Sequence, residues 1–242
     1  MGFLYLLLAF LPVLFYIGVI WSTQPVGSIN FRNSLHHFLS GIISIGLIFT
    51  YFRIFPGCQK LLNINSQWSY LFFSFIQIAL VEEISKFISF RIGETIRGET
   101  SVFYDKPIAT MFYCGITGLG FAFIENVTYA MQYGGDILLI RSLVAMLLHF
   151  LCGMIMGYWI SASRLPTKIK NRSLFEVLCV NNPNFKKVSY YIIGLICAVF
   201  IHGLYDYNLF TKGHITSNYL ILFSSAIAAY LAAKDLNHKS LN

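Results

Sequence analysis

Two adjacent glutamates, Glu82 and Glu83, lie inside an apolar stretch that is long enough to cross a membrane. The stretch reads WSYLFFSFIQIALVEEISKFISF from Trp68 to Phe90, and roughly 20 apolar residues suffice for a helix to span a bilayer. A carboxylate at the bilayer centre costs several kcal/mol, so an ionisable residue there indicates a functional site. A purely structural helix has no need of two.

The composition is that of an integral membrane protein. Of the 242 residues, 57% are hydrophobic and only 11% are charged, whereas soluble domains carry about 25% charged residues. The net charge of +7 is modest, and no basic patch is interleaved with aromatic residues, so we expect no nucleic-acid partner. The basic residues are instead expected to contact anionic lipid of the bilayer and to set the topology.

Seven apolar segments predict an all-α, polytopic membrane protein with about seven transmembrane helices. They cover residues 3–21, 36–55, 68–90, 108–132, 137–162, 188–210 and 216–233. The first is expected to be a retained span rather than a signal peptide, since it lacks a basic start and a cleavage site. The second and the last are the weakest predictions. The short link QYGGD predicts that the fourth and fifth segments form an antiparallel hairpin.

The basic residues of the loops predict the orientation of the chain. With seven spans, one side receives Arg32, Arg91, Arg97, Lys106, Arg164, Lys168, Lys170, Arg172, Lys186, Lys187, Lys234 and Lys239. The other side receives only Arg53, Lys60 and Lys212. Because positive loops stay in the cytoplasm, we expect a multi-pass protein of the cell membrane with its N-terminus outside and its C-terminus in the cytoplasm.

The cysteines are expected to be free thiols rather than a disulfide framework. They are odd in number and share no metal-type spacing. They are Cys58, Cys114, Cys152, Cys179 and Cys197.

The four central segments all carry ionisable groups in the predicted membrane interior, and the first and last carry none. Four of these groups, Glu83, Glu125, His149 and His202, lie roughly 8–20 Å from the nearer end of their segments at 1.5 Å per residue, so they are too deep to reach the interface easily. We therefore expect four helices to converge on one buried polar cavity. The interior polar residues are Glu82, Glu83, Lys86, Glu125, Asn126, Arg141, His149, His202 and Asp206.

Helical spacing suggests how these groups pair. Glu82 and Lys86 are four residues apart and share a face, which favours Glu82 as the partner of Lys86 and leaves Glu83 to face the cavity. His202 and Asp206 have the same spacing, so the carboxylate can orient the imidazole. His149, Gly153 and Gly157 form one stripe whose glycines permit close approach of a neighbouring helix.

Structural interpretations remain open for several of these residues. The glutamate pair can serve as an ion pair with Lys86 or Arg141, and Glu125 with Asn126 can clamp two helices together. His149 can be a packed residue, and Arg141 is expected to reach the interface from the outer end of its span. His36, His37, His214 and His238 are expected to lie at interfaces or in loops.

A buried set of this kind is typical of two chemistries. In hydrolysis, a glutamate acts as general base on water and histidines bind a metal or stabilise an oxyanion. In proton or ion transport, the same groups relay charge along a continuous path across the membrane. These residues alone do not separate a protease from a proton-coupled transporter or a binding subunit.

The order of the motifs resembles the PrsW family of intramembrane proteases, part of a wider group that includes the CAAX prenyl-protein endopeptidases. The chain carries EEISK at 82–86, FAFIEN at 121–126, His149 with Gly153, and HGLYD at 202–206. Phe121 and Glu125 stand in the second motif, where the wider group has Phe and His. Lys86 stands where that group has Arg. The resemblance covers about residues 82–206.

The resemblance implies a single integral membrane protease domain over residues 1–242 with a four-helix catalytic core at about 68–210. Glu82 or Glu83 would activate water, with Glu83 expected as the base and Glu82 as its charge-paired support. His149 and His202, assisted by Glu125, would bind a divalent metal such as zinc or stabilise the oxyanion, and a metal-independent mechanism stays open. Lys86, Asn126, Asp206 and Phe121 would support the site. The substrate would be a membrane-anchored protein such as an anti-sigma factor. A first (site-1) cleavage of that protein would start the release of a stress sigma factor.

Overall fold

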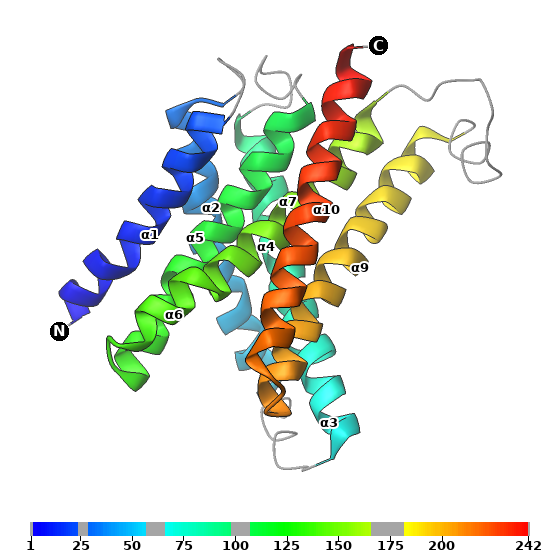
Figure 1. The fold of residues 1–242 in the computed structure, drawn as a ribbon. Helices are drawn as coiled ribbons and strands as arrows, with labels where there is room; N and C mark the ends of the chain where they lie inside the picture. Colours follow the sequence, from blue (N-terminus) through cyan, green and yellow to red (C-terminus); the bar gives the residue numbers. More distant parts are fainter. Residues whose placement is uncertain (1, 24–28, 57–65, 98–106, 166–181, 242) are drawn as a thin grey trace.

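A computed structural model describes residues 2–23, 29–56, 66–97, 107–165 and 182–241, and these residues contain helices and no strand (Figure 1). The elements are α1 (Gly2–Thr23), α2 (Phe31–Ile54), α3 (Gln67–Phe72), the π-helix η2 (Phe73–Leu80), α4 (Val81–Arg97), α5 (Pro107–Tyr133), α6 (Ile137–Leu143), α7 (Ala145–Arg164), α9 (Pro183–Phe210) and α10 (Ile215–Leu241). The all-α prediction is therefore confirmed.

Some sequence predictions fall outside the described residues. They concern Cys58 and Cys179, the basic residues Lys60, Lys106, Lys168, Lys170 and Arg172, and most of the predicted loop after Arg164. The remaining cysteines, Cys114, Cys152 and Cys197, are free thiols.

Within the described ranges, six helices are long and apolar enough to cross a membrane, and the two weakest predictions, α2 and α10, are among them. The unbroken helical run from Gln67 to Arg97 supplies a seventh span, which holds the glutamate pair. The chain starts at the lower end of α1 and finishes at the upper end of α10 (Figure 1), as an odd number of crossings requires. The prediction of about seven helices is thus confirmed.

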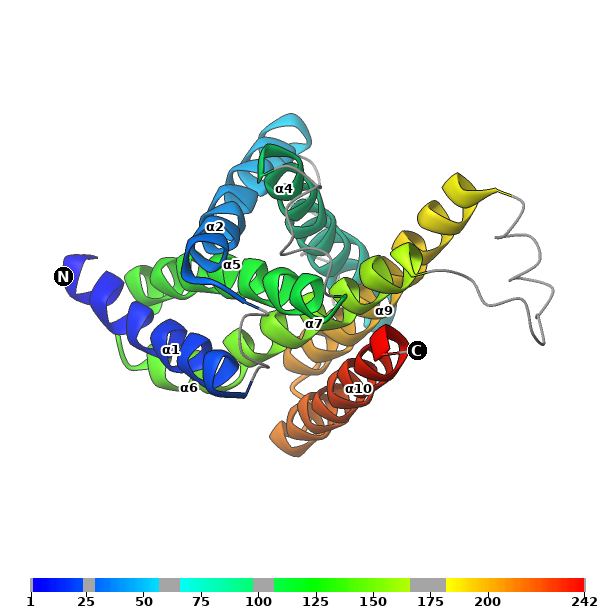
Figure 2. The ribbon, with the colours of Figure 1, turned by 90° about the horizontal axis from the view of Figure 1, so that it is seen from above.

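Helix α5 occupies the centre of the bundle and packs closely along α7 (Figure 2). A Cβ added at Gly153 of α7 would lie 2.5 Å from the Cys114 carbonyl oxygen of α5, and one at Gly157 would lie 2.6 Å from the Met111 Cα. The predicted glycine stripe therefore brings the two backbones together, which fixes the position of His149 one turn before Gly153.

The third span contains a feature that helical periodicity does not predict. Its middle segment, Phe73–Leu80, is a π-helix, which widens the turn immediately before Glu82. Such segments are rare and occur frequently at functional sites. Ser66 starts this span with a capping box in which its side chain and that of Ser69 satisfy each other's backbone N–H groups.

The predicted hairpin between the fourth and fifth spans is present. Gly134 ends α5 at a positive φ of 96°, a conformation that glycine adopts without strain. The fifth span is then divided at Val144 into the short α6 and the long α7. Arg141 lies on α6, just before this division.

Candidate active site

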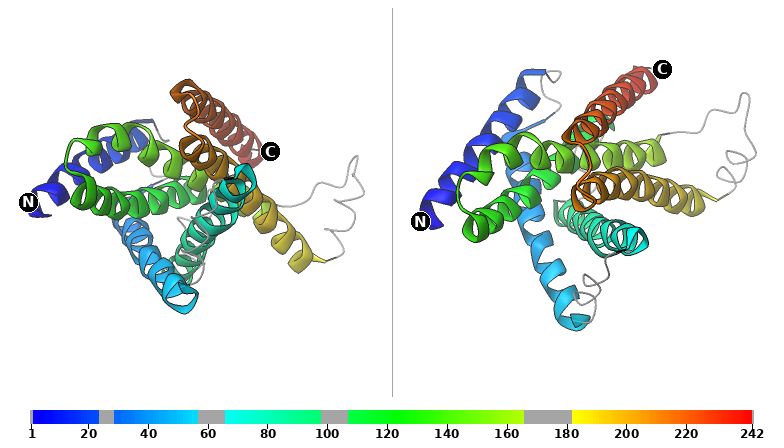
Figure 3. Two further views of the ribbon diagram at one scale, coloured as in Figure 1. Left: turned by 90° about the horizontal axis from the view of Figure 1, so that it is seen from below. Right: turned by 60° about the horizontal axis from the view of Figure 1, so that its bottom comes forward.

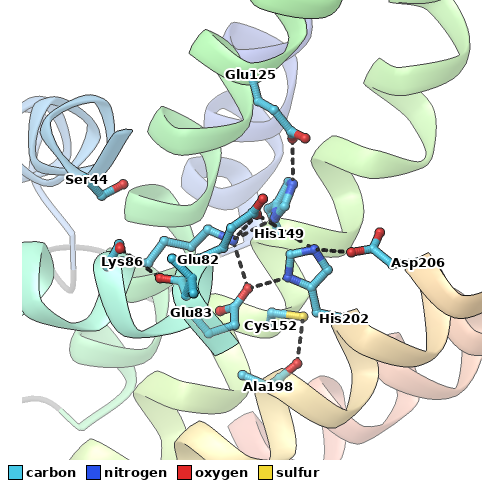
Figure 4. A network of polar contacts seen from close by, with 12 residues as sticks. Ser44, Glu82, Glu83, Lys86, Glu125, His149, Cys152, Ala198, His202 and Asp206 are labelled. Carbon is cyan, nitrogen blue, oxygen red and sulfur yellow. Dashed lines mark hydrogen bonds and ion pairs between the residues drawn. The ribbon is translucent and has the colours of Figure 1, made fainter. Parts of the chain in front are cut away.

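Four spans bring their ionisable side chains to one cluster (Figure 4). Helix α4 supplies Glu82, Glu83 and Lys86, α5 supplies Glu125, α7 supplies His149, and α9 supplies His202 and Asp206. The His149 and His202 rings lie edge to face with their centroids 5.0 Å apart. The convergence expected from sequence is therefore present in the geometry.

Glu83 is the buried, charge-paired member of the glutamate pair. Lys86 Nζ donates to Glu83 Oε1 at 2.7 Å, and the same oxygen lies 2.8 Å from His202 Nδ1. The Glu83 side chain is only 2% exposed. The expected ion pair of Lys86 with Glu82 is present at 3.6 Å, but the closer partner of Lys86 is Glu83, three residues away.

Glu82 is the member of the pair that lines a cavity. Its side chain is 14% exposed and lines a cavity. Its Oε2 lies 3.7 Å from His202 Nε2, and it has no hydrogen-bond partner within the described part of the chain. A buried carboxylate oxygen without a donor is costly, so this oxygen is available to a water, a metal or a substrate.

His149 is fixed from both sides of its ring. Its Nε2 lies 2.8 Å from Glu125 Oε2, and its Nδ1 lies 2.8 Å from Lys86 Nζ. Phe121 packs against the ring edge with centroids 5.0 Å apart, and the Lys86 ammonium lies 4.1 Å from the Phe121 ring centroid. Because the ammonium can only donate, His149 Nδ1 accepts a hydrogen bond from Lys86. The proton of the neutral ring is therefore on Nε2, which donates a hydrogen bond to Glu125.

His202 is oriented by two carboxylates. Glu83 contacts Nδ1, and Asp206 Oδ2 lies 3.4 Å from Nε2, as the spacing of four residues on α9 predicts. Asp206 Oδ2 has no hydrogen-bond partner among the described residues. His202 Nε2 therefore faces the carboxylates of Glu82 and Asp206, and all three residues line the cavity.

Arg141, which was expected to reach the interface, is held by partners inside the protein. Its Nη2 lies 2.8 Å from Glu125 Oε2, and its Nε donates to Asn126 Oδ1 at 2.9 Å. Its guanidinium lies 3.7 Å from the Tyr129 ring centroid. The tight hairpin was the signal for this contact, because it folds α6 back beside the end of α5.

A cavity of about 570 Å³ adjoins the cluster. Its lining comes from the end of the molecule where α9 meets α10 and α6 begins, the end brought forward at the right of Figure 3. Polar groups from the cluster form part of the wall, and most of the remainder is aromatic or aliphatic. Gln77 of the π-helix and Tyr129 also line it, and helical spacing alone singled out neither residue.

The residues fit a divalent metal. Glu82, His149 and His202 each offer a ligand atom, and these atoms lie within 4.8 Å of one another. Two histidines and one carboxylate with an open fourth position form a typical catalytic zinc set. The expected ligand Glu125 instead holds the far nitrogen of His149, as a carboxylate behind a metal-binding histidine does. Ligation through His149 Nδ1 requires Lys86 to release that nitrogen.

Comparison with known proteins gives a consistent result. The model of the PrsW family intramembrane metalloproteases matches residues 31–232. Protease PrsW of Oceanobacillus iheyensis is 28% identical over 136 residues, which are 56% of this chain and 54% of that protein. Protease PrsW of Bacillus subtilis strain 168 is 25% identical over 138 residues, covering 57% and 54% respectively.

The match to Protease PrsW of Geobacillus kaustophilus is of the same kind, with 25% identity over 139 residues. The chain spans about half the length of the curated relatives that it matches. No solved structure gives a significant match. Because the family model covers most of the chain and all four converging spans, this protein belongs to the PrsW family of intramembrane metalloproteases.

Proposed function

We propose that this protein is an intramembrane endopeptidase in which Glu82 activates the attacking water. The observation that carries this assignment is the Glu82 side chain, which lines a cavity beside two histidines and whose buried Oε2 lacks a hydrogen-bond partner in the described residues. The catalytic core is the four-helix unit from α3 to α9. Glu83, which we expected to be the base, is already bound to Lys86 and His202.

Hydrolysis breaks the peptide C–N bond and forms a C–O bond to water. Glu82 takes a proton from the water and returns it to the leaving amine. His149 and His202, held by Glu125 and Glu83, present fixed nitrogens beside the reacting centre. A divalent ion held by His149, His202 and one oxygen of Glu82, for which zinc is the first candidate, would polarise the carbonyl and acidify the water, and the other Glu82 oxygen would take the proton.

The substrate class follows from the place of the site. A cavity among transmembrane helices admits a segment of a membrane-anchored protein. The family resemblance directs the first test to a membrane-anchored anti-sigma factor. A transporter would need a polar path to both surfaces, and a cavity lined from one end of the molecule favours hydrolysis.

The test compares cleavage of single-span membrane proteins by the wild type and by two matched variants. Glu82→Gln should abolish cleavage, because an amide cannot take the proton. Glu83→Gln should retain measurable activity, because its amide oxygen still accepts a hydrogen bond. Cleavage by Glu82→Gln at the wild-type rate would sink the assignment. Elemental analysis of the purified protein and chelator sensitivity test the metal.

A further inference from the structure

Arg141 is the permanently charged basic residue in the cavity wall. Among the described residues that line the cavity, it is the one Lys or Arg. It projects from α6, and all three of its tethers, Glu125, Asn126 and Tyr129, belong to α5. An ion pair, a hydrogen bond and a ring contact therefore hold the guanidinium in one orientation, with its side chain 13% exposed.

The tethers leave part of the guanidinium unused. A guanidinium has five N–H donors in a fixed plane. The Nε donor binds Asn126 and Nη2 binds Glu125, whereas Nη1 has no hydrogen-bond partner within the described part of the chain. Nη1 is not among the buried polar atoms that lack a partner, so its donors are accessible to an acceptor that enters the cavity lined by Arg141.

The charges of the wall decide which acceptor fits. Glu82, Glu125 and Asp206 all line the same cavity. Glu125 already neutralises Arg141 at 2.8 Å. An anionic ligand such as a phosphate or a free carboxylate would meet this excess of carboxylates, so the charges favour a neutral carbonyl oxygen.

A segment that is to be cut must expose its backbone. A transmembrane helix has all its carbonyls bonded internally, and an unwound stretch inside the membrane leaves carbonyls that need new donors. We propose that Arg141 Nη1 binds a backbone carbonyl of the unwound substrate segment, which makes Arg141 a substrate-binding residue of the cavity. This inference rests on the proposed proteolytic function.

The experiment measures binding in the Glu82→Gln background, where no cleavage occurs. The probe is a fluorescent single-span peptide of about 25 residues, rich in Leu and Ala, with a Gly-Gly pair that eases unwinding. Adding Arg141→Gln should weaken binding about 10-fold to 100-fold, as the loss of a charge-assisted hydrogen bond does. Adding Arg141→Lys, which keeps the charge beside Glu125 but lacks the planar fork, should weaken it by a smaller factor.

The matched control is Arg53→Gln, which removes an exposed arginine from the last turn of α2, outside the cavity lining. It should leave binding unchanged. Equal binding by Glu82→Gln with and without Arg141→Gln overturns the proposal, and so does the absence of any binding to Glu82→Gln. Should Arg141→Gln not fold, Arg141→Lys decides the question in the same way.

Kinetics with a cleaved substrate separate substrate binding from a structural role. Loss of a carbonyl contact should raise KM, whereas an Arg141 that acts only by holding Glu125 and His149 should lower kcat at unchanged KM. The latter result overturns the proposal. Peptide binding that depends on Arg141 but is followed by no cleavage in the wild type contradicts the proposed function and supports the binding role.

Discussion

At the residue scale, burial decides the roles of the two glutamates. Residues three and four apart are both neighbours on a helix, so spacing does not choose between Glu82 and Glu83 as the partner of Lys86. The Glu83 side chain is 2% exposed and that of Glu82 is 14% exposed. The more deeply buried carboxylate has the greater need of a counter-charge, and it holds the ammonium at 2.7 Å.

Replacing Lys86 with Met should lower the free energy of unfolding by about 3–5 kcal/mol, because it leaves Glu83 buried without its counter-charge. Thermal or SDS-induced unfolding of the purified protein measures the change. The exposed Lys234→Met is the control and should shift stability by less than about 0.5 kcal/mol. Adding Glu83→Gln to Lys86→Met should recover much of the loss, and a double variant as unstable as the single one would contradict this explanation.

Glu125→Gln should weaken zinc binding about 10-fold to 100-fold, since a carboxylate behind a ligating histidine has an effect of this size. Competition with a chromophoric chelator measures the affinity. Asp235→Asn, which alters a contact with Tyr158 outside the cavity lining, should leave the affinity unchanged. Complete loss of binding in Glu125→Gln would instead identify Glu125 as a direct ligand, as the sequence motif suggested.

At the element scale, the features that depend on regular helical periodicity or on a short connecting link were predictable from sequence. The spans, the hairpin at Gly134 and the glycine stripe of α7 all appear in the structure. The π-helix at Phe73–Leu80 and the division at Val144 were not predictable, because both depart from regular α-helix geometry. The Arg141 contact was missed because the depth of a residue in its own span does not show which neighbouring span folds against it.

The close approach of α5 and α7 can be tested with two glycine-to-alanine variants whose expected changes in stability have opposite signs. Gly153→Ala should cost about 1–3 kcal/mol of stability, because its Cβ would lie 2.5 Å from the Cys114 carbonyl oxygen and push α7, with His149, away from α5. Gly46→Ala on α2, where no described atom beyond the adjacent backbone of α2 lies within 4 Å of the added Cβ, should instead stabilise by about 0.5–1 kcal/mol. Melting temperatures of the two variants measure this difference, and equal shifts would contradict the packing argument.

At the scale of the whole molecule, the two ends carry different ionic clusters. Away from the cavity, Glu94 is 1% exposed and binds Arg91 and, at 2.8 Å, Arg164. Sequence treated both arginines as loop charges, but Arg91 lies within α4 beside Glu94, and Arg164 at the end of α7 ties that helix to Glu94 of α4. Ion pairs of Glu94 thus hold the helices together at this end of the bundle, and the residues that line the cavity lie toward the opposite end.

The loop charges predict which end faces outward. The connection between α9 and α10 borders the cavity end and belongs to the side with few basic loop residues, whereas the end of α10 belongs to the basic side. In a variant whose native cysteines are replaced, His214→Cys should react with a membrane-impermeant maleimide in intact cells. Lys234→Cys should react only after the membrane is permeabilised. Both side chains are exposed, so the bilayer alone should separate them. The reverse pattern would place the cavity on the cytoplasmic side and direct the search for substrates to segments in the inner half of the membrane.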